Sequence, residues 1–361
     1  MDKTVHNNYI TIAKAIGIIL MVVGHSGCPE VIYRIIYFFH MPLFFFCSGI
    51  FMKNLTDNKV VVSFVKRRII RLYIPFVKWS VLFLILHNLL MSLGVYNSFY
   101  GFEGGSSYYT MKDMIIKVLH ILFTMHDYEE LLGGFWFIRA LFVSSILISV
   151  FSFLMRRINI YKQEIMCLLF FFCTVFIRRY APESDLWHDL SMGTFGAFFY
   201  MMGCIVMRYS NAWKNKCCAV LCLCLLAFFY YFNGRVSMEC GFNKVLPFSI
   251  SAVAGILLVI YLSNMIDART SYIKPVLYYI GNHTLDILAL HFLSFRFVSY
   301  NLALCYNMDL LHIAEHPVIK DIQSINNTWW WLLYTFIGIA APLLFNYAWL
   351  ELKKIVRLLR G

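Results

Sequence analysis

The chain has 361 residues, of which 61% are hydrophobic, 18% are aromatic and only 14% are charged. A soluble domain cannot bury so much apolar surface, so the composition argues against a soluble protein and predicts an all-α integral membrane bundle. The net charge of +12 does not collect into a soluble basic face, and we therefore expect no nucleic-acid partner.

Ten apolar runs follow one another along the chain, and each predicts one transmembrane helix. A helix needs ~20 residues to cross a hydrocarbon core of ~30 Å, and the fifth and seventh runs are near the short limit. The runs cover residues 9–27, 31–51, 72–94, 134–155, 163–178, 192–208, 217–233, 245–265, 274–297 and 328–351. No cleavable signal is expected before the first run, and residues 1–361 are predicted to form a single membrane domain.

The basic residues between the runs predict the orientation. With the N-terminus in the cytoplasm, the cytoplasmic segments hold more than twice as many lysines and arginines as the outer segments. Loops that stay in the cytoplasm are expected to show this excess. Both termini are therefore predicted to be cytoplasmic, and the longest loops, near 95–133 and 298–327, to face outward. The first of these loops contains an amphipathic segment, 111–134, which is expected to lie on the membrane or to dip into it.

The first run carries a lysine and a histidine in the stretch "YITIAKAIGIILMVVGHSG". Lys14 and His25 are eleven positions apart, which is ~20° past three helical turns, so both are expected on one face and ~16 Å apart along the axis. At that distance they serve different parts of one elongated ligand, or different partners. The structural alternatives are that Lys14 extends to the cytoplasmic headgroups and that His25 is a hydrogen-bonded structural histidine.

A basic cluster precedes the third run in "VKRRIIRLYIPF" and includes Arg67, Arg68 and Arg71. One interpretation is a topological flank on the cytoplasmic side. The other is an anion site, because Arg68 and Arg71 are three apart and can share a helical face that binds phosphates.

Further polar residues lie inside later runs, where ionisable groups are costly and are therefore functional candidates. His40 lies in the second run and, taken alone, is typical of a hydrogen-bonded core histidine. Arg139 follows Trp136 by about one turn in the fourth run. Asp286 and His291 lie in the ninth run, with Asp286 expected near mid-depth, and could exchange protons with a substrate.

The eleven cysteines do not indicate a metal site. Most lie in apolar runs, where cysteine behaves as a small hydrophobe, and "CCAVLCLC" lacks the paired C-x-x-C and histidine spacing of zinc ligands. We expect no metal.

Several of these segments together resemble the membrane-bound acyltransferase family 3, particularly the relatives of fucose 4-O-acetylase. The resemblance lies in "AKAIGIILMVVGH", "FFHMPLFFFCSG", "RRIIR", "GFWFIRALF" and "IGNHTLDILALHF". Lys14 and His25 satisfy the family pattern of a basic residue, ten positions and a histidine. Many members have arginine where this chain has Lys14, often with an acid at the position of Thr11 and glycine at that of Ala15.

The resemblance implies ten membrane helices, acetyl-CoA or a related thioester as donor, and a carbohydrate hydroxyl as acceptor. It assigns an essential role to His25 and donor binding to Arg68 and Arg71, with Arg67 beside them. The phosphates of a cytoplasmic CoA would then bind these cations and Lys14 while the thioester reaches His25.

His25 is then expected to act as a base on the sugar hydroxyl or to take the acetyl group itself, and Asp286, His291 or His40 could orient it. The acceptor is expected to be a cell-surface polysaccharide or a glycolipid, and the location the bacterial inner membrane. The alternative function is a transporter or flippase for a lipid-linked sugar or organic acid, which would use the same intramembrane charges as an ion relay.

Overall fold

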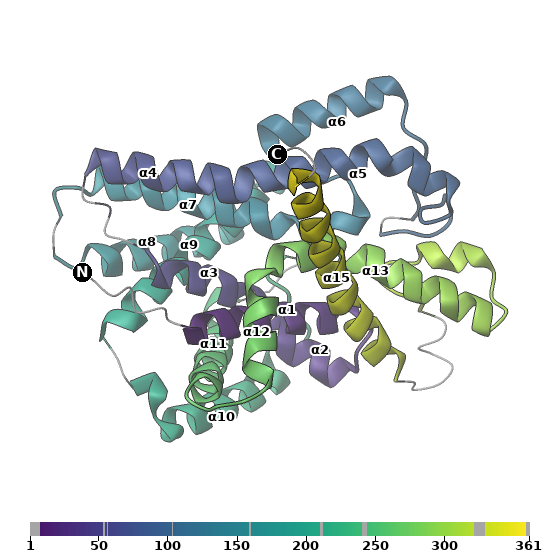
Figure 1. Ribbon diagram of the computed structural model, residues 1–361. Coiled ribbons are helices and arrows are strands. Elements are labelled where there is room, and N and C mark those ends of the chain that lie inside the picture. The colour runs from purple at the N-terminus through teal and green to yellow at the C-terminus, as the bar shows by residue number, and fades with distance from the viewer. Residues whose placement is uncertain are drawn as a thin grey trace. The chain divides into compact units, whose positions relative to one another are not determined.

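All regular elements in the described residues are helices, as the composition predicts (Figure 1). The structure is a computed structural model that describes residues 8–52, 55, 57–102, 104–158, 160–209, 212–239, 244–320 and 329–358. The two predicted cytoplasmic ends of the chain, 1–7 and 359–361, lie outside the described residues.

The helices follow the apolar runs closely, with short turns of other helical types between them. The α-helices are α1 (Asn8–His25), α2 (Glu30–Tyr37), α3 (His40–Ile50), α4 (Asn58–Arg68), α5 (Ile74–Ser92), α6 (Met111–Thr124), α7 (Trp136–Leu154), α8 (Lys162–Tyr180), α9 (Asp185–Tyr209), α10 (Lys216–Phe232), α11 (Val245–Asp267), α12 (Ile273–Asn282), α13 (Thr284–Cys305) and α15 (Trp330–Leu358). The shorter elements are the π-helical turn η1 (Ile69–Tyr73) and the 3₁₀ turns η2 (Glu130–Leu132), η3 (Ala212–Lys214) and η4 (Leu310–Ala314).

Eight helical stretches in the described part of the chain are long and apolar enough to cross a membrane, where the sequence predicts ten. They are Asn8–His25, Glu30–Ile50, Asn58–Ser92, Trp136–Leu154, Asp185–Val206, Val245–Asp267, Thr284–Cys305 and Trp330–Val356. The other two expected spans correspond to α8, which carries charged residues at both ends, and to α10, which has 17 residues. The membrane character is thus supported, and the count of ten stays a prediction.

Three runs differ in detail from their expected form. The second run is divided, because α2 ends at Tyr37 and α3 begins at His40. The third is the longer stretch Asn58–Ser92, so the basic cluster lies within helix rather than before it. The ninth is divided between α12 and α13, and Asp286 lies in the first turn of α13. The sequence did not predict this break, since a hydropathy average cannot detect a helix break between two apolar segments, and the expected mid-depth position of Asp286 stays a prediction.

The chain divides into two compact units, each assembled from separate stretches. The first unit comprises 1–17, 34–76 and 136–281, and the second comprises 18–33, 77–135 and 282–361. The prediction of a single domain stays a prediction.

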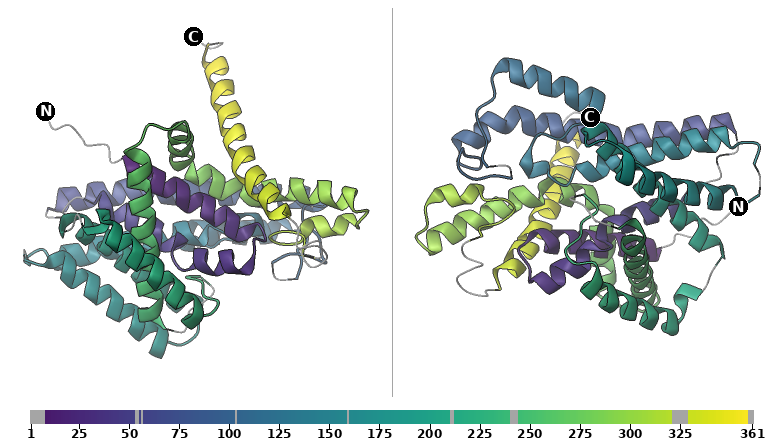
Figure 2. Two further views of the ribbon diagram at one scale, coloured as in Figure 1. Left: turned by 90° about the horizontal axis from the view of Figure 1, so that it is seen from below. Right: turned by 180° about the vertical axis from the view of Figure 1, so that it is seen from behind.

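In the first unit, α9 packs against α3, α7 and α8, and α4 runs beside α7 (Figures 1 and 2). Glycines allow the closest approach. A Cβ atom on Gly49 of α3 would lie 1.8 Å from the carbonyl oxygen of Tyr200, and one on Gly203 of α9 would lie 2.1 Å from that of Phe46. Small residues at such positions let membrane helices approach to backbone contact.

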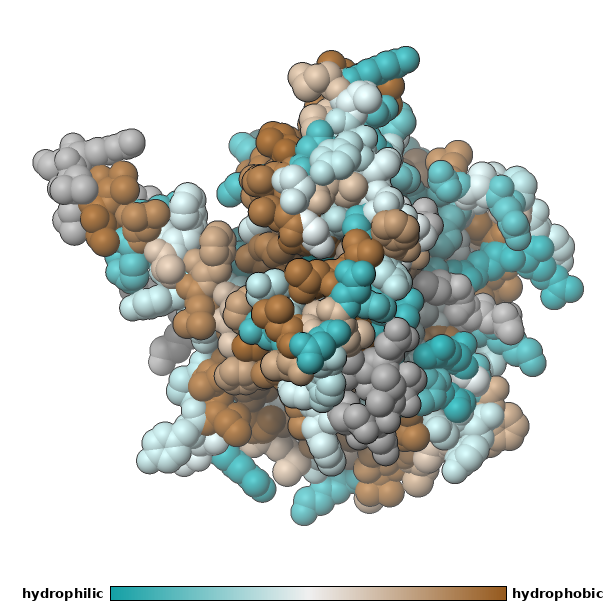
Figure 3. All heavy atoms as spheres, turned by 90° about the vertical axis from the view of Figure 1, so that its right-hand side faces the viewer, coloured by the Kyte–Doolittle hydropathy of each residue, from teal (hydrophilic) through white to brown (hydrophobic). Residues whose placement is uncertain are grey.

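In the second unit, α13 packs against α15, η2 and η4. Tyr334 of α15 is buried and its hydroxyl shares a hydrogen bond of 2.9 Å with Ser299 of α13. Much of α15 is exposed and apolar, including Phe336 and Leu344. Patches of hydrophobic side chains are also exposed on the face drawn in Figure 3, where they lie among hydrophilic ones, and such patches suit a surface that meets lipid.

Candidate active site

His25 is the last residue of α1 and lies beside two aromatic rings of α13. The centroid of its ring is 5.0 Å from that of Phe292 and 5.6 Å from that of His291. These residues all belong to the second unit. The structure therefore brings two of the sequence-predicted site residues together, His25 and His291, although 266 positions separate them in the chain.

His291 is fully buried within α13. Its Nδ1 lies 3.1 Å from the carbonyl oxygen of Ile287 and 3.0 Å from that of Leu288, so this nitrogen donates to its own helix. Its Nε2 is buried and has no hydrogen-bond partner among the described residues. His316 is close by, with its ring 4.5 Å from that of Phe292.

A buried ion pair lies on the same stretch of α13. Arg296 donates to a carboxylate oxygen of Glu130 at 3.0 Å, and both side chains are at least nine-tenths buried. The guanidinium also donates to the carbonyl oxygens of Ile313 and Glu315. Arg296 thereby ties η2 and the segment around η4 to α13. Burial raises the pKa of Glu130 even though the positive charge of Arg296 acts in the opposite direction.

A second buried pair joins α5 to the residues before η2. His87 Nδ1 lies 3.0 Å from Glu129, and its Nε2 lies 3.0 Å from the carbonyl oxygen of Ser107. The ring of Tyr109 stacks on that of His87 with centroids 3.6 Å apart. Both nitrogens of this buried ring therefore face oxygen atoms that accept hydrogen bonds.

Sequence reasoning did not find these two pairs. Arg296 interrupts the apolar stretch "FLSFRFVSYNLALC", and this interruption was the available signal. Glu129 and Glu130 lie next to each other in the predicted amphipathic segment, where charges look like a solvated face. Their partners are 42 and 166 positions away, beyond the reach of spacing arguments.

Lys14 lies in the first unit, on the same uninterrupted α-helix as His25. It is half-buried, and its ammonium is close enough to Cys47 of α3 for the two groups to interact electrostatically. Two residues further along α3, the carbonyl oxygen of Gly49 accepts from Cys204 of α9 at 3.0 Å. Lys14 thus lies at one end of a series of contacts that passes through α3 to α9.

Arg68 lies at the other end of this series. Its guanidinium donates to the hydroxyl of Tyr200 on α9 and lies over the ring of Phe64 at 4.7 Å. Tyr200 is fully buried, so it holds Arg68 against the interior of the first unit. The expected phosphate-binding residue and Lys14 therefore both contact the paired helices α3 and α9 within one unit.

Arg67 and Arg71 are exposed. Arg67 donates to Ser63 at 3.0 Å, and Arg71 lies in the π-helical turn η1 that directly follows Arg68. Short π-helical insertions of this kind are frequent at functional sites. The wider turn also rotates Arg71 further from Arg68 than three residues of α-helix would.

The remaining predicted residues have partners elsewhere. His40 donates from Nδ1 to the carbonyl oxygen of Ile36 at 2.9 Å, as expected of a core histidine. Asp286 accepts from Asn346 of α15 at 2.6 Å. Arg139 forms an ion pair of 3.0 Å with Asp189, and the ring of Trp136 lies against that of Phe137.

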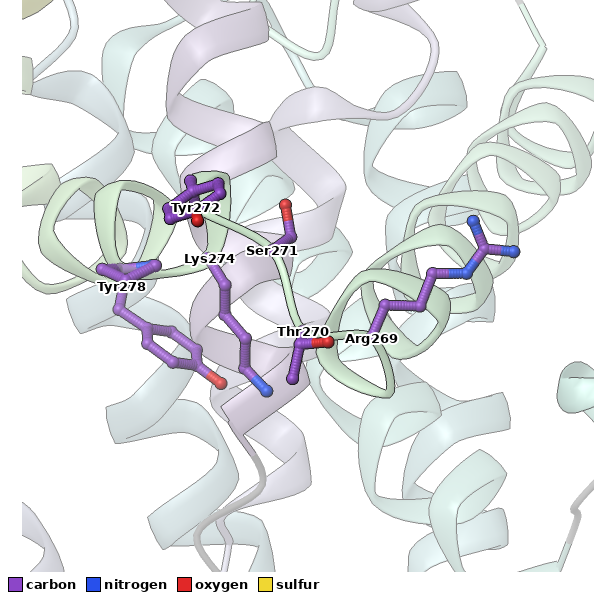
Figure 4. A pocket seen from close by; sticks show the side chains of 7 residues that line it. Arg269, Thr270, Ser271, Tyr272, Lys274 and Tyr278 are labelled. Carbon is purple, nitrogen blue, oxygen red and sulfur yellow. The ribbon is translucent and has the colours of Figure 1, made fainter.

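A cavity of about 560 Å³ lies at the turn between α11 and α12 in the first unit (Figure 4). Lys274 lines it and forms an ion pair of 2.8 Å with Asp267, which also accepts from the hydroxyl of Tyr278 at 2.5 Å. The side chain of Arg269 points away from Lys274 in Figure 4, so the two cations do not converge. None of the sequence-predicted site residues lines this cavity.

No group of three or more His, Cys, Asp or Glu side chains among the described residues is arranged to hold a metal ion. In the comparison with protein families, the model of an acyltransferase domain matches residues 7–347, which is nearly the whole chain. The search of curated proteins and the search of solved structures found no match.

Proposed function

This chain belongs to the membrane-bound acyltransferase family 3, and from that premise we propose that it is an O-acetyltransferase of the bacterial inner membrane. The donor is cytoplasmic acetyl-CoA, and the acceptor is a hydroxyl of a cell-surface polysaccharide or a lipid-linked precursor. The observation that carries the proposal is the position of His25, at the end of an apolar helix and beside a second histidine, His291, which is fully buried.

Donor binding is assigned to the cationic end of the first unit. CoA carries several negative charges, and arginine is well suited to phosphate because its planar group donates two hydrogen bonds at once. Arg68 is held by Tyr200, while Arg67 and Arg71 are exposed to an incoming anion. Lys14 extends the positive charge along α1 toward His25, ~16 Å away along the helix axis.

The reaction is assigned to His25. As a base, its unprotonated nitrogen takes the proton of the acceptor hydroxyl while the oxygen bonds to the acetyl carbon and the bond to sulfur breaks. The same proton then passes to the CoA thiolate. As a nucleophile, the imidazole would instead carry the acetyl group between the two substrates. Both routes need a neutral ring with one free lone pair.

Substitution of His25 tests the proposal. His25→Ala is expected to lower acetyl transfer from labelled acetyl-CoA by at least about 10²-fold, because general acid–base catalysis contributes that much or more. His120→Ala is the matched control, since His120 is exposed on α6 and hydrogen-bonded to Tyr128. Purified protein with wild-type turnover after the His25 change would refute the assignment.

The donor site has its own test. Arg68→Ala and Arg71→Ala together are expected to raise the KM for acetyl-CoA, with Arg156→Ala as an exposed arginine control. An unchanged KM would exclude the phosphate role. Asp286, His40, Arg139 and Trp136 are assigned only supporting roles, because each has a described partner other than His25.

A further inference from the structure

The hydrogen bonds of His291 determine which of its nitrogens carries the proton. Nδ1 faces two carbonyl oxygens of its own helix, at 3.1 and 3.0 Å, and neither can donate. A ring nitrogen that faces only acceptors must be the one that bears hydrogen. In the neutral ring the other nitrogen, Nε2, therefore has a free lone pair.

That lone pair lies in a place where an unused acceptor is unfavourable. His291 is fully buried, and Nε2 has no partner among the described residues. Buried nitrogens are normally hydrogen-bonded, and an exception calls for a functional explanation. The backbone contacts explain why Nδ1 is buried, but they do not explain why a polar nitrogen is retained on the opposite side of the ring.

His25 is a polar neighbour with which such a nitrogen can interact. The two ring centroids are 5.6 Å apart, and Phe292 packs against both rings, at 5.0 Å from His25 and 3.9 Å from His291. A small rotation of the His25 side chain, or one bridging water, is enough to complete a hydrogen bond over this separation.

We infer that His291 is a positioning residue for His25. Its Nε2 accepts the N–H of one His25 nitrogen, directly or through one water, and so directs the lone pair of the other His25 nitrogen to the reacting groups. This inference rests on the proposed function of His25.

The proton balance is simple. His25 takes one proton from the acceptor hydroxyl and returns it to the CoA thiolate, while His291 keeps its own proton on Nδ1 throughout. During the step His25 is positively charged, and its hydrogen bond to His291 becomes charge-assisted and stronger. A neutral acceptor suits this site because a carboxylate in the same apolar surroundings would be an additional buried charge.

Two amide substitutions separate the roles of the two nitrogens. In His291→Asn the side-chain amide lies where Nδ1 lies, so the contact with the backbone carbonyls is retained and Nε2 is lost. In His291→Gln the amide extends to the position of Nε2 and supplies an acceptor oxygen there. A purely structural role predicts that Asn is the better substitute, whereas a positioning role predicts that Gln is.

We expect His291→Asn to lower kcat about 10²-fold and His291→Gln to lower it less than about tenfold. The KM for acetyl-CoA should stay within about threefold of wild type in both, because His291 acts through His25 and not on the donor. The thermal unfolding temperature of each detergent-solubilised variant shows whether it is folded. Equal kcat values for the two folded variants, or a better Asn variant, would overturn the inference.

A second measurement does not depend on turnover. Diethylpyrocarbonate modifies the unprotonated nitrogen of histidine, and mass spectrometry gives the rate at His25 itself. We expect this rate to fall at least about threefold in His291→Asn and to stay near wild type in His291→Gln, while the rate at exposed His120 is unchanged in both. Equal His25 rates in all three proteins would contradict the positioning role.

The two measurements also separate this inference from the proposed function. If wild type fails to transfer acetyl from acetyl-CoA while the His25 rates still differ as expected, the proposed reaction is wrong and the histidine pair stands. If wild type transfers acetyl and the variants do not differ in either measurement, the proposed reaction stands and the histidine pair is wrong.

Discussion

Glu130 and Arg296 concentrate opposite charges where almost no solvent reaches them. Their carboxylate and guanidinium are 3.0 Å apart, and Glu130 also accepts from the backbone N–H of Phe102 at 2.8 Å. A buried pair of this kind adds little net stability by itself, but removal of one partner leaves the other charge uncompensated. The pair therefore makes the segments around η2 and η4 depend on α13.

We predict that Glu130→Gln destabilises the protein strongly, because Arg296 then keeps its charge in an apolar setting. The expected loss is about 3–5 kcal/mol in the free energy of unfolding, which denaturant titration of the solubilised protein would measure. Glu351→Gln is the matched control, since Glu351 pairs with Lys354 on an exposed surface. A Glu130 variant as stable as that control would contradict the prediction.

His316 gives the stability a pH dependence. Burial, followed by the nearby charge of Arg296, lowers its pKa from 6.5 to about 3. Between these two values the unfolded chain binds a proton that the folded chain does not, so stability present above pH 6.5 is lost as the pH falls.

The expected slope from this one group reaches about 1.4 kcal/mol per pH unit. The free energy of unfolding is measured for wild type and for His316→Asn across this pH range. The difference between the two isolates the contribution of His316 from that of the other histidines. The stability of the variant should fall less steeply with decreasing pH than that of wild type. Identical slopes would mean that His316 takes up its proton over the same pH range in the folded protein as in the unfolded chain.

Individual site residues were predictable only where they are unusual in their local sequence. His25 and Lys14 are polar residues in an apolar run, and the resemblance added a role for each. The pairs His87–Glu129 and Glu130–Arg296 were not predictable, because each residue is ordinary in its own segment and the pairing exists only in three dimensions. The sequence suggested that Asp286, His291 or His40 could orient His25. It did not indicate which of the three residues lies beside His25.

At the scale of elements, α3 and α9 approach each other to backbone contact. Gly49 and Gly203 each lie against a backbone carbonyl of the opposite helix. The same interface contains Tyr200, whose hydroxyl binds Arg68. Any separation of the two helices would therefore also move the expected phosphate-binding residue.

We predict that Gly203→Ala lowers the unfolding free energy by about 1–3 kcal/mol or more, because the added methyl meets backbone rather than a flexible side chain. Thermal unfolding in detergent measures the loss. Ser48→Ala is a suitable control on α3, since its hydroxyl donates within its own helix, to the carbonyl oxygen of Phe44. An unfolding temperature equal to that of the control would show that α3 and α9 can move apart without cost.

Elements were predicted well in kind and less well in their interruptions. The all-helical class and most helix positions follow from apolar runs, because a membrane helix must satisfy its backbone internally. The breaks at Phe38–Phe39 and at His283, and the π-turn at Ile69–Tyr73, depend on local backbone hydrogen bonding. Hydropathy averages over a window and does not contain that information.

For the whole molecule, the open question of topology is whether α8 and α10 cross the membrane. Eight helical stretches in the described residues meet the length and hydropathy expected of a span. With eight spans, or with ten if α8 and α10 both cross, the two ends of the chain lie on the same side of the membrane. A reporter at the C-terminus therefore cannot distinguish eight spans from ten. A reporter between α8 and α9 can.

We predict that alkaline phosphatase fused after Glu183 is active in bacterial cells and that a fusion after Lys214 is inactive. The enzyme needs disulfides, which form outside the cytoplasm, so activity reports an outer location. Green fluorescent protein at the C-terminus should fluoresce and serves as the control for a cytoplasmic end. An inactive fusion after Glu183 would mean that α8 does not cross and that the predicted count is too high.

The division of the chain into two units has a consequence for anyone who builds chimeras. The boundaries fall at 17/18, 33/34, 76/77, 135/136 and 281/282, and the first three interrupt α1, α2 and the first turn of α5. A transplanted half would need all five junctions to match. Three of these junctions lie within helices, where a mismatch would change both the helical register and the face that each side chain occupies. Specificity is therefore better exchanged between relatives through their loops than through whole halves.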